Sequence, residues 1–191
     1  SVFLYNSAGG SRLLALHLPG LLPAVMSVLP PVIAALGGGI PSAMFGLLPA
    51  INPYKALLGS VFLYNSAHMV KLTLHLTASK GVLNNDNPRA DADRIMASDK
   101  TYGPIMARCN AAHNNGLESF PVFAAGVLAC ELAGVDKTTV GKLCTFHLLT
   151  RVAFNVFYMG FANNTAGLAR TVVWLLSLIS SCQLIGMAAR K

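Results

Sequence analysis

The stretch TVVWLLSLISSCQLIGMAA, from Thr171 to Ala189, decides the fold of this chain. It runs for 19 residues without a charged side chain, and Arg190 and Lys191 follow it directly. Crossing the hydrocarbon core of a bilayer takes roughly 20 apolar residues, and basic residues anchor the end of such a helix among the lipid headgroups. This stretch therefore predicts a transmembrane helix with a basic anchor.

The composition of the whole chain agrees with a protein of the lipid bilayer. Of its 191 residues, 54% are apolar and 11% are charged, whereas soluble proteins average roughly 45–50% and about 25%. The net charge of +7 comes from basic residues that are scattered along the sequence. No basic block is present, which argues against nucleic acid as a partner. Contact with anionic lipid headgroups explains the charge balance.

Three further apolar segments precede the last one, at residues 56–79, 103–135 and 141–162. Together with residues 171–189 they predict an all-α, transmembrane four-helix bundle over residues 56–191, and hence a multi-pass integral membrane protein. Residues 80–100 are hydrophilic and are predicted to form the principal loop. Because this loop holds more Lys and Arg than the other connections, the positive-inside rule places it on the cytoplasmic side.

Residues 1–55 form an apolar, Pro/Gly-rich N-terminal extension. Residues 13–36 carry no charge but contain four prolines, which predicts a kinked extra helix or a poorly ordered apolar segment. The octapeptide SVFLYNSA occurs at residues 1–8 and again at residues 60–67. It indicates either a duplicated first span or an artefact of the gene prediction, and both interpretations stay open.

Polar residues interrupt the second predicted span. At about 100° per residue, Arg108, Asn115 and Glu118 share one face of a helix. Charged groups at membrane depth are costly and usually face the bundle interior or a water-filled cavity, so this face is a hypothesis for a functional site. Interhelical ion pairs of Glu118 with Arg108 or Arg151 explain the same residues equally well.

A second polar stripe lies on the third predicted span, where Arg151, Asn155 and Tyr158 stand at positions i, i+4 and i+7. Arg170 follows at the beginning of the last span, where a short loop end can close over the site. Arginines bind carboxylates in a bidentate manner, and Glu118 can accept an ammonium group. The two stripes together suit a small zwitterionic ligand.

The sequence does not predict a metal site. No set of His, Cys, Asp and Glu residues has the spacing of metal ligands. By themselves His113 and His147 favour structural roles, because a lone histidine in a helix commonly hydrogen-bonds a neighbouring group.

At these residues the sequence resembles the MAPEG family, the membrane-associated proteins in eicosanoid and glutathione metabolism. The motif R-x4-H-x-N-x-x-E-x-x-P is present from Arg108 to Pro121, followed by RVAFNVFY at residues 151–158 and by ART at residues 169–171. Ala111 stands where eicosanoid-forming members carry an arginine, and Phe154 and Trp174 depart from the prostaglandin E synthase pattern. The sequence is therefore closer to the less characterised branch that includes many bacterial members.

The resemblance implies a homotrimer with glutathione as cofactor, bound between adjacent protomers near the cytoplasmic face. It implies that Arg170 is the catalytic residue, because a positive charge near the glutathione sulfur favours the thiolate. The membrane is expected to be the endoplasmic reticulum or another internal membrane in a eukaryote, and the inner membrane in a bacterium. The residues expected to bind glutathione are Arg108, His113, Asn115, Glu118, Arg151, Tyr158 and Thr171.

The functional hypothesis is a glutathione-dependent membrane enzyme, a transferase or peroxidase that acts on a lipophilic electrophile from the bilayer. The alternative is a non-enzymatic lipid-binding scaffold of the same fold. A third interpretation is a structural protein whose polar face serves only interhelical ion pairs.

Overall fold

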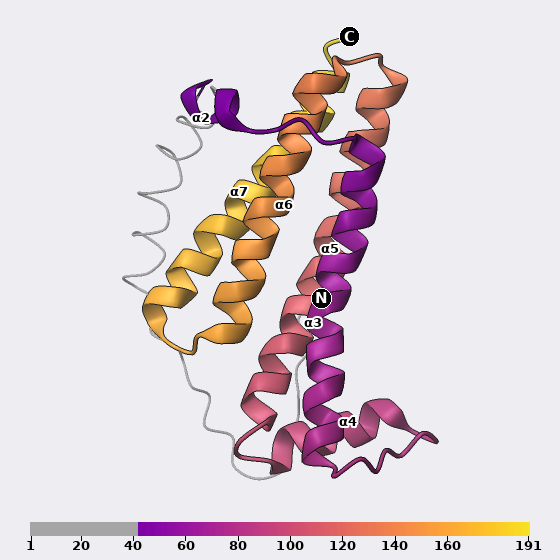
Figure 1. Ribbon diagram of the computed structural model, residues 1–191, viewed down its shortest axis with the longest axis vertical. Coiled ribbons are helices and arrows are strands. Elements are labelled where there is room, and N and C mark those ends of the chain that lie inside the picture. Colours follow the sequence, from indigo (N-terminus) through magenta and orange to yellow (C-terminus); the bar gives the residue numbers. More distant parts are fainter. Residues whose placement is uncertain (1–41) are drawn as a thin grey trace, which may run out of the picture. The chain divides into compact units, whose positions relative to one another are not determined.

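The computed structural model describes residues 42–191, and this part of the chain is helical with no strand (Figure 1). The all-α prediction is therefore confirmed for these residues. The predicted extension at residues 1–55 lies outside the described residues up to position 41. The six helices are α2 (Ser42–Leu47), α3 (Pro53–Ala78), α4 (Pro88–Ser98), α5 (Gly103–Leu132), α6 (Lys137–Gly160) and α7 (Asn164–Ala188).

The four long helices α3, α5, α6 and α7 coincide with the four apolar segments predicted from the sequence. The largest difference is at α7, which begins at Asn164 and not at Thr171. The Asn163 side chain caps this helix by accepting a hydrogen bond from the Ala166 amide at 2.8 Å, as preferred N-cap residues do. As a result Arg170 lies within the helix, and the prediction that it belongs to a loop end was wrong.

The predicted loop at residues 80–100 contains a helix that the sequence analysis missed. Helix α4 begins after Asn87, whose side chain accepts a hydrogen bond from the Ala90 amide at 3.3 Å. Pro88 occupies the first helical position, where a missing amide proton costs nothing, and Asp91 adds a negative charge to the first turn, where the helix dipole favours it. The sequence analysis assigned this segment to a loop because it is polar, although its N-terminal residues are those of a well-capped helix.

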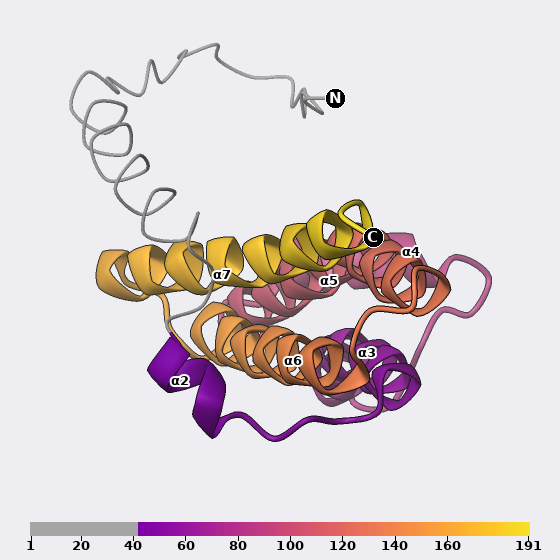
Figure 2. The ribbon, with the colours of Figure 1, turned by 90° about the horizontal axis from the view of Figure 1, so that it is seen from above.

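The long helices pack along one another in two layers (Figure 2). Helices α5 and α7 lie in one layer and α3 and α6 in the other, with contacts of α3 to α5 and of α6 to α7 between the layers. Fully buried apolar side chains fill the space between them, among them Met106, Phe123, Val127 and Leu184. Helix α4 rests against the beginning of α5 and the end of α3.

Among the described helices, α7 is the one whose length and apolar composition are sufficient to cross a membrane. Its most apolar window has a mean hydropathy of 1.7. Polar side chains within the other long helices, such as Arg151 in α6, lower the mean hydropathy of these helices. The segment with which the sequence analysis began thus lies in the helix whose length and composition suit a membrane span.

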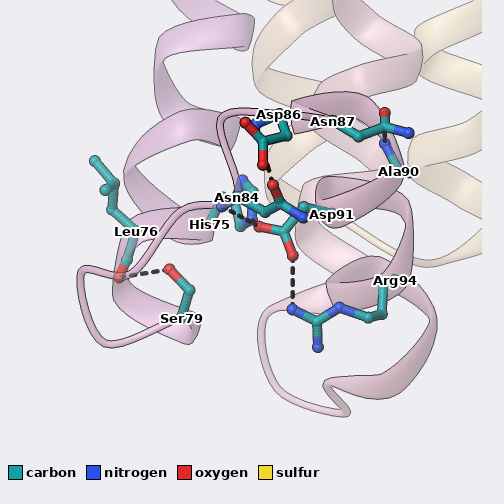
Figure 3. A network of polar contacts seen from close by, with 9 residues as sticks. All are labelled: His75, Leu76, Ser79, Asn84, Asp86, Asn87, Ala90, Asp91 and Arg94. Atoms are coloured by element: carbon teal, nitrogen blue, oxygen red, sulfur yellow. Dashed lines mark hydrogen bonds and ion pairs between the residues drawn. The ribbon is translucent and has the colours of Figure 1, made fainter.

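A polar network joins the end of α3 to α4 (Figure 3). The Asp91 carboxylate contacts the His75 imidazole Nε2 at 3.0 Å, accepts the Asn84 amide at 3.3 Å, and accepts the Arg94 guanidinium at 2.6 Å. The chain reverses at Lys80 and Gly81, both with positive φ. Asp91 therefore fixes the connecting loop between its two flanking helices.

Candidate functional site

One hydrogen bond joins the two predicted polar stripes inside the helical core. The Arg151 guanidinium of α6 donates to the Asn115 side-chain oxygen of α5 at 2.9 Å. Arg151 is only 4% exposed, and its guanidinium lies 4.4 Å from the centre of the Phe154 ring. A buried guanidinium with one protein acceptor keeps further donors free, so this pair can bind an additional acceptor such as a carboxylate.

A hollow of about 120 Å³ opens beside this pair, between α5, α6 and α7. Asn115 and Glu118 line it from α5, and Trp174 and Ser177 line it from α7. Glu118 is exposed in the single protomer. Asn115 and Glu118, which were predicted to share one face of α5, thus both line this hollow from α5.

A second cluster lies where α6 ends and α7 begins. The Arg170 guanidinium lies 4.1 Å from the centre of the Tyr158 ring, a cation–π arrangement between the two helices. The Arg108 Nε donates to the carbonyl of Met159, next to Tyr158, at 3.3 Å. Two guanidinium groups therefore flank the end of α6.

Helix geometry relates the two clusters. Arg108 and Asn115 are seven residues apart on α5, which corresponds to about 10 Å along the helix axis. Helix α6 runs antiparallel to α5. Met159, the partner of Arg108, therefore comes later in the sequence than Arg151, the partner of Asn115. The guanidinium cluster thus lies at the α4 end of the long helices (Figure 1), and the Asn115 pair lies about two turns deeper.

Two of the predicted residues do not join either cluster. His113 faces α3, where its Nδ1 lies 3.0 Å from the Tyr64 carbonyl and its ring centre lies 5.0 Å from that of His68. Thr171 donates to the carbonyl of Gly167 one turn back in its own helix and is exposed. Asn155 also turns to α3 and donates to the Leu63 carbonyl at 3.1 Å.

The order of these residues and the helices that hold them agree with a comparison against protein families. The model of the MAPEG family matches residues 54–190, which is most of the chain. The chain belongs to the MAPEG family. No curated protein and no solved structure gave a match.

This MAPEG protein also contains a buried polar cluster that the sequence analysis did not connect to the site. His147 stacks on Phe123 with ring centres 3.8 Å apart and planes within 1°, and its Nδ1 lies 3.1 Å from the Ser177 carbonyl and 3.2 Å from the Ser180 hydroxyl. His147 also lines the hollow next to Asn115. The serines at positions 177, 180 and 181 share one face of an apolar helix, and this spacing was the available signal.

Interhelical ion pairs do not account for the polar face of the MAPEG domain. Within residues 42–191, the salt bridges are His75–Asp91, Arg94–Asp91 and Lys137–Glu131. None of them includes Arg108, Glu118 or Arg151. The charges on this face are therefore not neutralised by one another in the described part of the protomer.

Proposed function

We propose that this MAPEG protein is a glutathione-dependent membrane enzyme, with transferase or peroxidase activity on a lipophilic electrophile. The observation that carries the proposal is the Arg170 guanidinium 4.1 Å from the Tyr158 ring at the end of α6. About two turns deeper in α6, Arg151 pairs with Asn115, which lines the hollow together with Glu118. A cation is thereby fixed at the end of α6, and neighbouring helices supply charged groups of both signs.

The residues present fit the charges of glutathione, which has two carboxylates, one ammonium group and one thiol. Arg151 is oriented by Asn115 and stacked on Phe154, so its guanidinium is pre-organised to bind a carboxylate. Glu118 takes part in no salt bridge within residues 42–191, and it can accept the ammonium group. Arg108 supplies a second guanidinium for the other carboxylate. His113 faces α3 and Thr171 is bonded within its own helix, so neither residue is part of the proposed ligand contacts.

Arg170 has the proposed catalytic role. Stacking on Tyr158 restricts its guanidinium to the α6–α7 end of the site, where it stabilises the negative charge of a bound thiolate. In the transferase reaction the thiol proton passes to solvent, the sulfur forms a bond to the electrophilic carbon, and the leaving group departs with the electrons of the broken bond. In the peroxidase reaction two glutathione thiols are oxidised to the disulfide, and a lipid hydroperoxide is reduced to the alcohol and water.

Assembly of several protomers is part of the proposal. A hollow of about 120 Å³ is smaller than the roughly 300–1,000 Å³ of typical ligand sites. Glu118 on its rim is exposed, so a second protomer can complete the walls. We therefore propose a homotrimer in which α3, α5, α6 and α7 of each copy span the membrane as a four-helix bundle, with glutathione bound between copies near the cytoplasmic face.

The test compares Arg170 of α7 with an arginine just beyond the other end of this helix. Replacing Arg170 by Ala in the purified protein is expected to lower kcat for conjugation of glutathione to an aryl halide roughly a hundredfold, because one electrostatic stabiliser of the reacting sulfur is lost. The ultraviolet absorbance of bound thiolate is expected to decrease with it.

Arg190→Ala is the matched control. Arg190 is exposed and lies just beyond the other end of α7, where its guanidinium donates to the Gly186 carbonyl of that helix. Unchanged conjugation by Arg170→Ala would overturn the proposed mechanism. Calorimetry that detects fatty acid binding but no glutathione binding would favour the lipid-binding scaffold.

A further inference from the structure

A second hollow of the described residues lies apart from the candidate glutathione site. It has a volume of about 610 Å³ and lies between α3, the beginning of α5, and α4 with its preceding loop. This volume falls within the roughly 300–1,000 Å³ of typical ligand pockets. Helix α5 contributes Asn110 and Asn114 to this lining, and these are different residues from those that it contributes to the glutathione site.

Nitrogen donors dominate the polar part of this hollow. Lys71 projects from α3 and donates to the Asn110 side-chain oxygen at 2.8 Å, and Arg89 lines the opposite wall from α4. The imidazoles of His68 and His113 lie 5.0 Å apart in the same lining. Asp93 is the one carboxylate among the lining residues. When the imidazoles are uncharged, the lining carries the two positive charges of Lys71 and Arg89 and the one negative charge of Asp93.

One nitrogen in this hollow has no partner in the protein. The Nδ1 atom of His68 is buried and makes no hydrogen bond within the described residues. Buried polar atoms without a partner are uncommon in native proteins and call for an explanation. Because His68 lines the hollow, a bound polar group or ordered water can satisfy its ring.

The hollow also has an apolar side. Leu72 of α3, Leu83 of the connecting loop and Leu117 of α5 are part of its lining. A wholly polar solute leaves these side chains without a partner, whereas an amphiphile covers them. Burial of apolar surface is worth roughly 25 cal/mol per Å², so an attached hydrocarbon chain adds to the affinity of the charged head.

The wall formed by α4 and the loop is held in place without a ligand. Asp91 binds the His75 imidazole and the Asn84 amide at the same time (Figure 3), and both residues line the hollow. Arg94 completes the coordination of this carboxylate. The opening is thus pre-formed, which lowers the entropic cost of binding.

We propose that this hollow is a second binding site, which takes an amphiphilic organic anion with a carboxylate or phosphate head. Lys71 and Arg89 bind the anionic head, and Leu72, Leu83 and Leu117 contact the apolar part. The proposal does not rest on glutathione binding, because the two sites share no charged residue. The anion comes either from a single-chain lipid of the bilayer or from a free phosphorylated or carboxylated metabolite.

The experiment is calorimetry of the full chain in a maltoside detergent, with decanoate, decyl phosphate, inorganic phosphate and decanol as probes. Decanoate and decyl phosphate are expected to bind, and decanol is expected not to bind. Tighter binding of decyl phosphate than of inorganic phosphate would assign the site to a lipid. Equal binding of the two phosphates would assign it to a free anion. Binding of decanol as tight as that of decanoate would overturn the proposal.

Variants test the assigned residues. Arg89→Gln and Lys71→Met are each expected to weaken decanoate binding about tenfold, since each removes a charge-assisted hydrogen bond. Asp93→Asn removes the opposing carboxylate and is expected to tighten binding severalfold. Lys55→Met is the matched control, because Lys55 is exposed in the first turn of α3, far along the helix from Lys71.

Glutathione binding by the same variants separates the two sites. We expect it to be unchanged in Arg89→Gln, whose side chain is exposed and takes part in no salt bridge within residues 42–191. Equal decanoate affinities in the wild type, Arg89→Gln and Lys71→Met would overturn the second site. Parallel loss of glutathione and decanoate binding in Arg89→Gln would also overturn it, because one site would then take both ligands.

Discussion

At the scale of single residues, close approach between α3 and α5 depends on Gly116. A methyl group added at this position would overlap the Cβ of Tyr64, and the Tyr64 carbonyl is also the partner of His113. The contact therefore sets the spacing of α3 and α5, which line the second proposed site. Tyr64 belongs to the second copy of the SVFLYNSA repeat, whose role in packing the sequence did not reveal.

Gly116→Ala is expected to lower the free energy of unfolding by about 1–3 kcal/mol, the usual cost of inserting a methyl group into a well-packed core. Thermal unfolding in detergent measures it. Gly186→Ala is the matched control, because a methyl group there would meet nothing within 4 Å and alanine favours a helix. Equal unfolding temperatures of Gly116→Ala and the wild type would contradict the described contact.

Also at this scale, helical periodicity predicted the geometry of the candidate site in part. It placed Asn115 and Glu118 on one face, and both line one hollow. It did not predict that Arg151 pairs with Asn115, or that His113 faces α3. The spacing of residues gives the direction of a side chain around its own helix axis, whereas the partner depends on which helix packs against that direction.

At the scale of elements, α4 and the loop before it depend on one carboxylate. The Arg94 guanidinium, followed by the Asn84 amide, holds the pKa of Asp91 below its usual range. A lowered pKa in the folded state means that the ionised carboxylate stabilises the fold above the ordinary Asp value of about 3.9. This contribution is lost as the pH falls from that value through the lower folded pKa.

Asp91→Asn is therefore expected to open α4 at neutral pH, because it removes the charge that holds Arg94 and His75. Hydrogen exchange of the α4 amides measures the opening. The difference from the wild type is expected to shrink as the pH falls below about 4, since the wild-type carboxylate is then protonated and asparagine has none to protonate. Asp86→Asn, whose carboxylate takes part in no salt bridge within residues 42–191, is the control. Equal protection in all three proteins would contradict the role of Asp91.

At the scale of the whole molecule, many apolar side chains of the protomer remain uncovered. Leu58, Phe62 and Met69 of α3, Leu128 of α5 and Val156 of α6 are each more than 40% exposed. Lipid can cover such a surface, and neighbouring copies can cover part of it. The exposed position of Glu118 favours a neighbouring copy at that side of the bundle.

We expect a trimer when the protein is solubilised in a mild detergent, with glutathione binding confined to that species. Native mass spectrometry gives the number of copies, and calorimetry on separated fractions gives the binding. The reason is that one protomer leaves the hollow at Glu118 open. A monomeric fraction that binds glutathione as tightly as the assembled protein would contradict this prediction.

The sequence by itself determined the helical class and the bounds of four long helices to within a few residues, apart from the beginning of α7. It could do so because each of the four is a long, predominantly apolar segment, which is the composition expected of a membrane helix. The stretch from Thr171 to Ala189 was correctly predicted to be helical because it is long and contains no charged side chain. The family followed from ordered motifs on three helices, which need no knowledge of the packing.

Only the tertiary structure decided which polar groups meet. Helix α4 was missed because its stability comes from capping and from Asp91, whose partner His75 is 16 residues away in the sequence. The hollow between α3, α4 and α5 is lined by side chains from three separate segments of the chain, so no local sequence pattern predicts it. Such a site arises from the distance between packed helices, and that distance depends on close contacts such as Gly116 with Tyr64.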